Sequence, residues 1–120
     1  MLLVTALALV ACQTAPVDAL SEKIVQINYK FSGPRSEFDR VNLPYAKPIA
    51  DTRGLRWKIW VVNEEEGEAG GIYLFEDAAA VQAFLTGPII AALKSSTPTV
   101  SIKSFDVMAE HTLVTRGPVK

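Results

Sequence analysis

The sequence predicts a single α+β domain of the ferredoxin-like type, in which the order β-α-β-β-α-β builds a four-stranded antiparallel sheet under two helices. Three observations predict it. The chain has 120 residues, which is enough for one domain. Runs of alternating apolar residues mark strands near both ends and a hairpin in the middle. Segments with helical spacing, interrupted by prolines, separate these strands.

The first strand is expected over residues 24–31, where apolar and polar side chains alternate and leave one thoroughly apolar face. Ser32-Gly33-Pro34 ends this strand. Helical spacing follows over about 36–51. Because Pro44 and Pro48 forbid one regular helix there, the pattern predicts a broken or kinked helical segment.

The second and third strands form a β-hairpin over residues 54–75, with a polar turn at 64–68. Most of the reactive side chains of the chain lie on this hairpin: Trp57, Lys58, Trp60 and Tyr73. Trp57 and Trp60 are three residues apart on a strand, so they project to opposite faces. One faces the space between sheet and helices and the other the far side, and the spacing does not decide which. Since both faces are largely apolar, we expect two chains to pair sheet on sheet as a homodimer.

The remainder of the chain completes the pattern. Asp77 can cap a helix that Gly87-Pro88 interrupts, and a further short helix runs through Leu93. The last strand is expected over about 99–108. The tail 109–120 is polar and is expected to be mobile or wrapped on a partner.

The N-terminal residues 1–22 are interpreted as a leader and tether, and residues 23–120 as the domain. Residues 1–11 are apolar and uncharged, as in the apolar region of a secretory signal. The segment that ends at Cys12 resembles the bacterial lipobox, so Cys12 is the expected lipidation residue and the cell envelope or periplasm the expected location. A basic segment before Leu2 is missing, and the alternative is a cytoplasmic domain whose leader is not a functional signal.

Composition excludes several classes of function. Twelve basic and thirteen acidic residues give a net charge of −1, without the basic excess of a nucleic-acid binder. One Cys allows no intrachain disulfide, and His111 is the only histidine available to a metal site. No nucleotide-binding motif is present. We therefore expect neither a metal nor an organic cofactor.

Four segments together resemble the YdhR-type putative monooxygenase family, which is similar to the dimeric α+β barrels. They are Phe31-x-Gly33-Pro34, Gly54-x-x-Trp57-Lys58-x-Trp60, Glu68-Ala69-Gly70-Gly71-Ile72-Tyr73-Leu74-Phe75 and Phe105-Asp106-Val107. The resemblance covers roughly residues 24–108. It implies paired ferredoxin-like units and a superfamily that includes quinone-forming oxygenases without bound cofactor and haem-degrading enzymes. Fold alone does not settle the activity.

The candidate catalytic residues are Trp57, Lys58, Trp60 and Tyr73, and the candidate substrate contacts are Gln26, Asn28, Tyr29 and Phe75. An indole or phenol ring can hold a flat molecule, and a lysine can stabilise its anion. The resemblance implies oxidation of a small phenol or quinol by O₂ without a cofactor. Two alternatives stay open: the aromatic residues only pack a core, and Lys58 pairs with a carboxylate such as Asp106. The alternative function is an envelope-tethered dimeric module that binds a hydrophobic ligand without catalysis.

Overall fold

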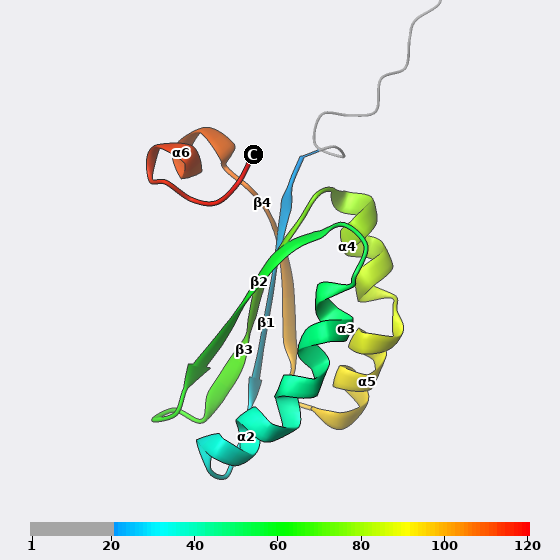
Figure 1. Ribbon diagram of the computed structural model, residues 1–120, viewed down its shortest axis with the longest axis vertical. Coiled ribbons are helices and arrows are strands. Elements are labelled where there is room, and N and C mark those ends of the chain that lie inside the picture. Colours follow the sequence, from blue (N-terminus) through cyan, green and yellow to red (C-terminus); the bar gives the residue numbers. More distant parts are fainter. Residues whose placement is uncertain (1–20) are drawn as a thin grey trace, which may run out of the picture.

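The computed structural model describes residues 21–120, which form one sheet with helices on both sides (Figure 1). In chain order the elements are β1 (Lys23–Lys30), α2 (Arg35–Asn42), η1 (Leu43–Tyr45), α3 (Ala46–Ala50), β2 (Leu55–Asn63), β3 (Glu68–Phe75), α4 (Ala78–Leu85), α5 (Pro88–Ser96), β4 (Ser101–Asp106) and α6 (Ala109–Val114). The expected signal segment and the lipidation at Cys12 lie outside the described residues.

The sheet confirms the predicted topology. Its strand order is β2-β3-β1-β4, and every neighbouring pair is antiparallel. With the intervening helices this is the ferredoxin-like β-α-β-β-α-β arrangement. The strand ends differ from the expected ones by up to two residues, as is usual for strands called from a pattern.

The two faces of the sheet follow from strand alternation and register. The inner face carries Val25, Ile27, Tyr73 and Phe75, which join the main hydrophobic core with Phe84 and Ile90 of the helices. Burying each of the large side chains contributes about 1.5–3 kcal/mol to stability. The outer face carries the alternate residues, among them Ile24, Gln26 and Asn28 on β1. Figure 1 shows α4 and α5 on one side of the sheet and α6 on the other.

Prolines determine where the helices break and where α5 begins. The predicted broken segment over 36–51 is confirmed as α2, η1 and α3 in succession. Asp77 caps α4 by accepting a hydrogen bond from the backbone N–H of Ala80 at 2.8 Å, and Pro88 begins α5. Within residues 21–120 no single helix is long and apolar enough to cross a membrane. Among these residues, only α4 and α5 taken together, with a bend of 48° between them, have the length and composition of a membrane span.

The C-terminal tail differs from the expectation, because it forms α6 and folds back on its own chain. The indole N–H of Trp57 donates to the carbonyl of Pro118 at 2.9 Å, and the backbone N–H of Lys120 donates to Glu22 at 2.6 Å. Glu22 is buried and also pairs with Arg56 at 2.8 Å. The folded unit therefore includes Glu22, and the tail stands on the outer face of the sheet beside Trp57.

Candidate functional site

A cavity of about 380 Å³ lies between the inner face of the sheet and the helices. Its sheet wall consists of Ile27, Tyr29, Lys58, Trp60, Gly70, Gly71 and Tyr73, and its helical wall of Val41, Asn42, Tyr45, Ile49, Ile89, Ile90, Ala92, Leu93, Ser96 and Thr97. Most of this lining is apolar or aromatic. A concave, mainly apolar space with few polar groups is typical of a small-molecule site, and we call it the inner cavity.

Lys58 is the charged side chain of the inner cavity. Its register places it opposite Tyr73 on β3, so both side chains project from the inner face. The Lys58 Nζ lies 3.2 Å from the centre of the Trp60 ring and 4.6 Å from that of Tyr73. An added Cβ at Gly71 would stand 2.5 Å from the Lys58 Cε, so the glycine leaves the space through which the lysine chain passes. The stacking of a cation over two rings is a cation–π arrangement.

Burial changes the acidity of Lys58. No carboxylate within residues 21–120 forms an ion pair with it, and Asp106, the partner considered from the sequence, pairs with Lys23 at 2.6 Å instead. Burial without an opposite charge lowers the pKa of Lys58 to about 7. At neutral pH the side chain is therefore poised between a cation and a neutral amine that can accept a proton.

Burial raises the pKa of two tyrosines of the inner cavity, Tyr29 and Tyr73, whereas it lowers the pKa of Lys58. Burial raises the pKa of Tyr73, and the nearby Tyr29 raises it further. Burial also raises the pKa of Tyr29. Both phenols consequently stay protonated at neutral pH and can donate hydrogen bonds to an oxygen atom of a bound molecule. The Tyr73 ring is fixed from behind by Phe84, with ring centres 5.3 Å apart.

The structure brings together four of the predicted site residues, since Tyr29, Lys58, Trp60 and Tyr73 all line the inner cavity. Phe75 does not line it. Its side chain is fully buried in the core beside Tyr73, with ring centres 6.2 Å apart.

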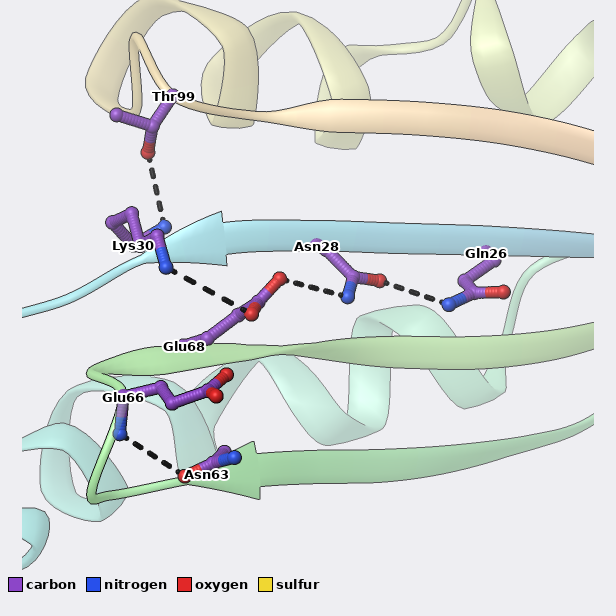
Figure 2. A network of polar contacts seen from close by, with 7 residues as sticks. All are labelled: Gln26, Asn28, Lys30, Asn63, Glu66, Glu68 and Thr99. Carbon is purple, nitrogen blue, oxygen red and sulfur yellow. Dashed lines mark hydrogen bonds and ion pairs between the residues drawn. The ribbon is translucent and has the colours of Figure 1, made fainter.

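Trp57, Gln26 and Asn28 lie on the outer face and are not part of the inner cavity. Strand alternation explains this placement, because each neighbours a residue that points inward. Gln26 donates to Asn28 at 3.3 Å, and Asn28 donates to Glu68 at 3.1 Å (Figure 2). Glu68 is also 3.8 Å from Lys30. These side chains satisfy one another instead of facing a ligand.

The helical wall was missed at the sequence level. Asn42, Tyr45, Ser96 and Thr97 are the polar residues that it adds to the inner cavity. Their spacing relative to the hairpin cannot be read from the sequence because it depends on how α2, α3 and α5 pack on the sheet. The one available signal was the proline-broken stretch around Tyr45, which interrupts the helix where it passes the hairpin.

A second cavity of about 390 Å³ adjoins the first along the edge strand β2. Its lining includes Arg35, Phe38 and Leu43, and it shares Trp60 and Asn42 with the inner cavity. Arg35 is already held by Asp39 at 2.8 Å. Trp60 thus forms part of the boundary between two spaces.

Within residues 21–120 no three His, Cys, Asp or Glu side chains are grouped so that they could hold a metal ion. His111 is exposed on α6 and does not line either cavity. The acidic residues Glu64, Glu65 and Glu66 are exposed in the hairpin turn.

The comparisons with known proteins concern the family and the fold. A family model described as "Putative mono-oxygenase ydhR" matches residues 24–118. None of the curated proteins compared matches the chain.

Three solved structures share the fold. A protein of unknown function from Nitrosomonas europaea aligns with a TM-score of 0.59 at 19% identity, over 75% of this chain and 92% of that one. A mutant of SnoaB, a cofactor-independent oxygenase from Streptomyces nogalater, aligns with a TM-score of 0.59 at 18% identity, over 73% and 94%. A haem-degrading protein from Mycobacterium tuberculosis, solved free of haem, aligns with a TM-score of 0.51 at 21% identity, over 73% and 93%.

Proposed function

The chain belongs to the YdhR mono-oxygenase family, and we propose that it oxidises a small aromatic phenol or quinol with O₂ in the inner cavity, without a bound cofactor. The observation that carries the proposal is Lys58, an amine without a carboxylate partner among residues 21–120, stacked on Trp60 and Tyr73 in an apolar cavity. The fold shared with a cofactor-independent oxygenase supports the same class of reaction.

The proposed reaction needs a substrate that becomes electron-rich when it loses a proton. Neutral Lys58 takes a proton from a phenolic O–H or an activated C–H group, and the resulting ammonium holds the anion by charge. The anion passes one electron to O₂, the substrate radical and superoxide combine into a peroxide anion, and the Lys58 ammonium returns its proton to that anion. Loss of water leaves a carbonyl group on the ring system. One oxygen atom enters the product and the other leaves as water, and all four electrons come from the substrate.

The other residues of the cavity have simpler tasks in this scheme. The Trp60 ring offers a flat surface on which an aromatic substrate can stack. The protonated phenols of Tyr29 and Tyr73 can donate hydrogen bonds to an oxygen of the substrate, which favours its anionic form. These contacts orient the ring so that its acidic proton faces Lys58.

Oxygen uptake tests the proposal. The purified protein is supplied with anthrone, naphthohydroquinone and catechol without added cofactor, and compared with Lys58→Met and Trp60→Phe. Loss of a general base typically costs 10²–10⁴-fold, so we expect Lys58→Met to lower kcat by about 100-fold or more. Trp57→Phe is the matched control, because Trp57 lies on the outer face.

Two outcomes would count against the proposal. Uptake that is unchanged in Lys58→Met would remove the lysine from the reaction. No uptake with any substrate, accompanied by ligand-dependent quenching of Trp60 fluorescence, would favour a binding module without catalysis.

We also propose that two chains pair through their outer faces. Ile59 of β2 and Phe105 of β4 are 51% and 46% exposed there, on the two edge strands of the sheet, and Ile72 lies opposite Ile59, so apolar side chains are left open to solvent. The near-neutral net charge of −1 leaves little repulsion between copies. Light scattering should give the mass of a dimer for the wild type and of a monomer for Ile59→Asp. Leu43→Asp, which changes an exposed residue of η1, should stay dimeric.

A further inference from the structure

We propose that Lys58 is also a covalent binding site for aldehydes and ketones, which condense with its Nζ to form an imine inside the inner cavity. The inference uses the same cavity as the proposed oxidation. Imine formation requires no O₂ and no electron transfer. An experiment can therefore contradict the imine without contradicting the oxidation, and the reverse.

The geometry distinguishes Lys58 from the other described lysines. Lys23, Lys30 and Lys47 each pair with a carboxylate: Asp106 at 2.6 Å, Glu68 at 3.8 Å and Asp51. Lys94, Lys103 and Lys120 are exposed. Of the lysines within residues 21–120, only Lys58 lines the inner cavity, with its Nζ held 3.2 Å above the Trp60 ring. A desolvated amine in an apolar cavity is the arrangement in which lysine acts as a nucleophile.

The electrostatics of the cavity support this role. The titratable groups that line it besides Lys58 are phenols: Tyr29 of β1, Tyr45 of η1 and Tyr73 of β3. No carboxylate or second cation lines it, from the strands or from α5. Burial lowers the pKa of Lys58 to about 7, so about half of it is the neutral amine at that pH. An ordinary lysine, with a pKa of about 10.4, is neutral in roughly one molecule in 2,500.

The condensation is balanced within the cavity. The lone pair of the neutral Nζ forms a bond to the carbonyl carbon while the C=O π electrons move to oxygen. A proton from the nitrogen and one from solvent reach that oxygen, which leaves as water, the second proton of the nitrogen goes to solvent, and a C=N bond remains. The protonated phenols of Tyr29 and Tyr73 are donors for the carbonyl oxygen as its charge grows. An aryl group attached to the carbonyl has the face of Trp60 to stack on.

Borohydride trapping tests the inference. The purified protein is mixed with benzaldehyde at pH 7 under nitrogen, and sodium borohydride then transfers hydride to any imine carbon and makes the adduct permanent. Peptide mass mapping should place at least about 100-fold more label on Lys58 than on Lys103, because of the difference in neutral amine. Lys58→Arg, which keeps the charge but is not a nucleophile, should remove this label, and Lys103→Arg should not.

Several results would overturn the inference. Label spread evenly over the lysines of the wild type would do so even if Lys58→Arg failed to fold. Labelling of Lys58 that grows in parallel with Lys103 up to pH 10, without levelling off above about pH 7–8, would show an ordinary amine. Excess 2-naphthol, a ring without a carbonyl, should protect Lys58 from label, and a lack of protection would place the reaction outside the cavity. Oxygen uptake plays no part in any of these readouts.

Discussion

The two faces of the sheet carry similar residue types and use them differently. On the outer face, Trp57 donates to Pro118 and Glu68 is bonded to Asn28 and Lys30, so these polar groups have partners. On the inner face, Trp60 and Lys58 contact each other, and within residues 21–120 the lysine has no ion-pair partner. Satisfied polar groups stabilise a surface, whereas an unsatisfied one in a cavity is available to a ligand. The contrast favours the inner face as the place of the proposed site.

The same contrast separates two lysines. Lys23 is buried and Lys58 is half-buried, and Lys23 reaches Asp106 at 2.6 Å at the end of the sheet. The opposite charge compensates the loss of hydration of Lys23. Lys58 has aromatic rings in place of a carboxylate, and burial lowers its pKa to about 7. Reactivity therefore depends on the neighbours of the side chain and not on burial alone.

The largest expected effect concerns two adjacent glycines. An added Cβ at Gly70 would stand 1.8 Å from the backbone oxygen of Ile27, which cannot move without breaking the β1–β3 pairing. At Gly71 it would meet the flexible Lys58 chain at 2.5 Å. We expect Gly70→Ala to cost about 3 kcal/mol or more and Gly71→Ala about 1 kcal/mol, measured by urea unfolding.

The Gly71→Ala variant has a second readout. Displacing the Lys58 chain toward solvent should raise the pKa of Lys58 toward its ordinary value, as followed by NMR of its Cε resonance. Equal costs for the two glycines, or an unchanged pKa, would contradict this account of the inner face.

The second prediction concerns stability against pH. The folded-state pKa of Lys58, about 7, lies below the unfolded value of about 10.4, so the unfolded chain binds more protons between these values. The free energy of unfolding should therefore rise with pH over this range. Because Lys58 is only partly buried, we expect a rise of about 1–2 kcal/mol between pH 7 and pH 9.5, less than the full shift implies.

Two variants isolate the contribution of Lys58. Lys58→Met should remove this rise and unfold at a higher urea concentration than the wild type at pH 7. Lys103→Met, at an exposed position of β4, should keep the wild-type profile. A wild-type profile that is flat from pH 7 to pH 9.5, or the same rise in Lys58→Met, would show that the ammonium is well solvated.

The fold was predictable from sequence because its signals are local. Alternation in β1 and the hairpin, together with the breaks at Pro44 and Pro88, is enough to set the order of elements. Alternation also places Trp57 and Trp60 on opposite faces. Which of the two tryptophans faces the helices depends on a bulge at Arg56. Leu55 pairs with Phe75 and Trp57 with the adjacent Leu74, so Arg56 is the extra residue on β2. The bulge lets Leu55 and Lys58 both face the helices, and no residue pattern announces it.

The cavity was only partly predictable for a related reason. The sheet residues Lys58, Trp60 and Tyr73 could be chosen because one hairpin carries them all. Gln26 and Asn28 were chosen for their polarity, but polar residues on a half-buried strand usually mark the side away from the core. The helical wall depends on the packing of distant segments. The polar composition of residues 109–120 likewise did not predict α6. The residues after α6 are held by single contacts, such as the hydrogen bond between Trp57 and Pro118.

The third prediction compares the two tryptophans. Trp57→Phe removes the hydrogen bond to the carbonyl of Pro118 and should cost about 1 kcal/mol of stability. Amide hydrogen exchange in residues 109–120 should become faster, because this bond ties the tail to the sheet. Trp60→Phe is the matched control and should leave exchange in the tail unchanged. Faster exchange in both variants would mean that the tail responds to the whole hairpin and not to this contact.

The smallest expected effect is that of Glu68→Gln on the outer face. The amide oxygen can still accept from Asn28, so the change removes only the 3.8 Å ion pair with Lys30. Such a half-exposed pair is worth about 0.3 kcal/mol, and 0.5 M NaCl should abolish the difference. Pairing of two chains through this face would bury the same carboxylate and raise the cost several-fold. Urea unfolding at low and high protein concentration separates the two cases, since only a paired outer face makes the cost grow with concentration. A loss of stability above about 1 kcal/mol that does not depend on protein concentration would contradict both the exposed and the paired case. It would mean that the tail or the hairpin turn already shields Glu68 within one chain.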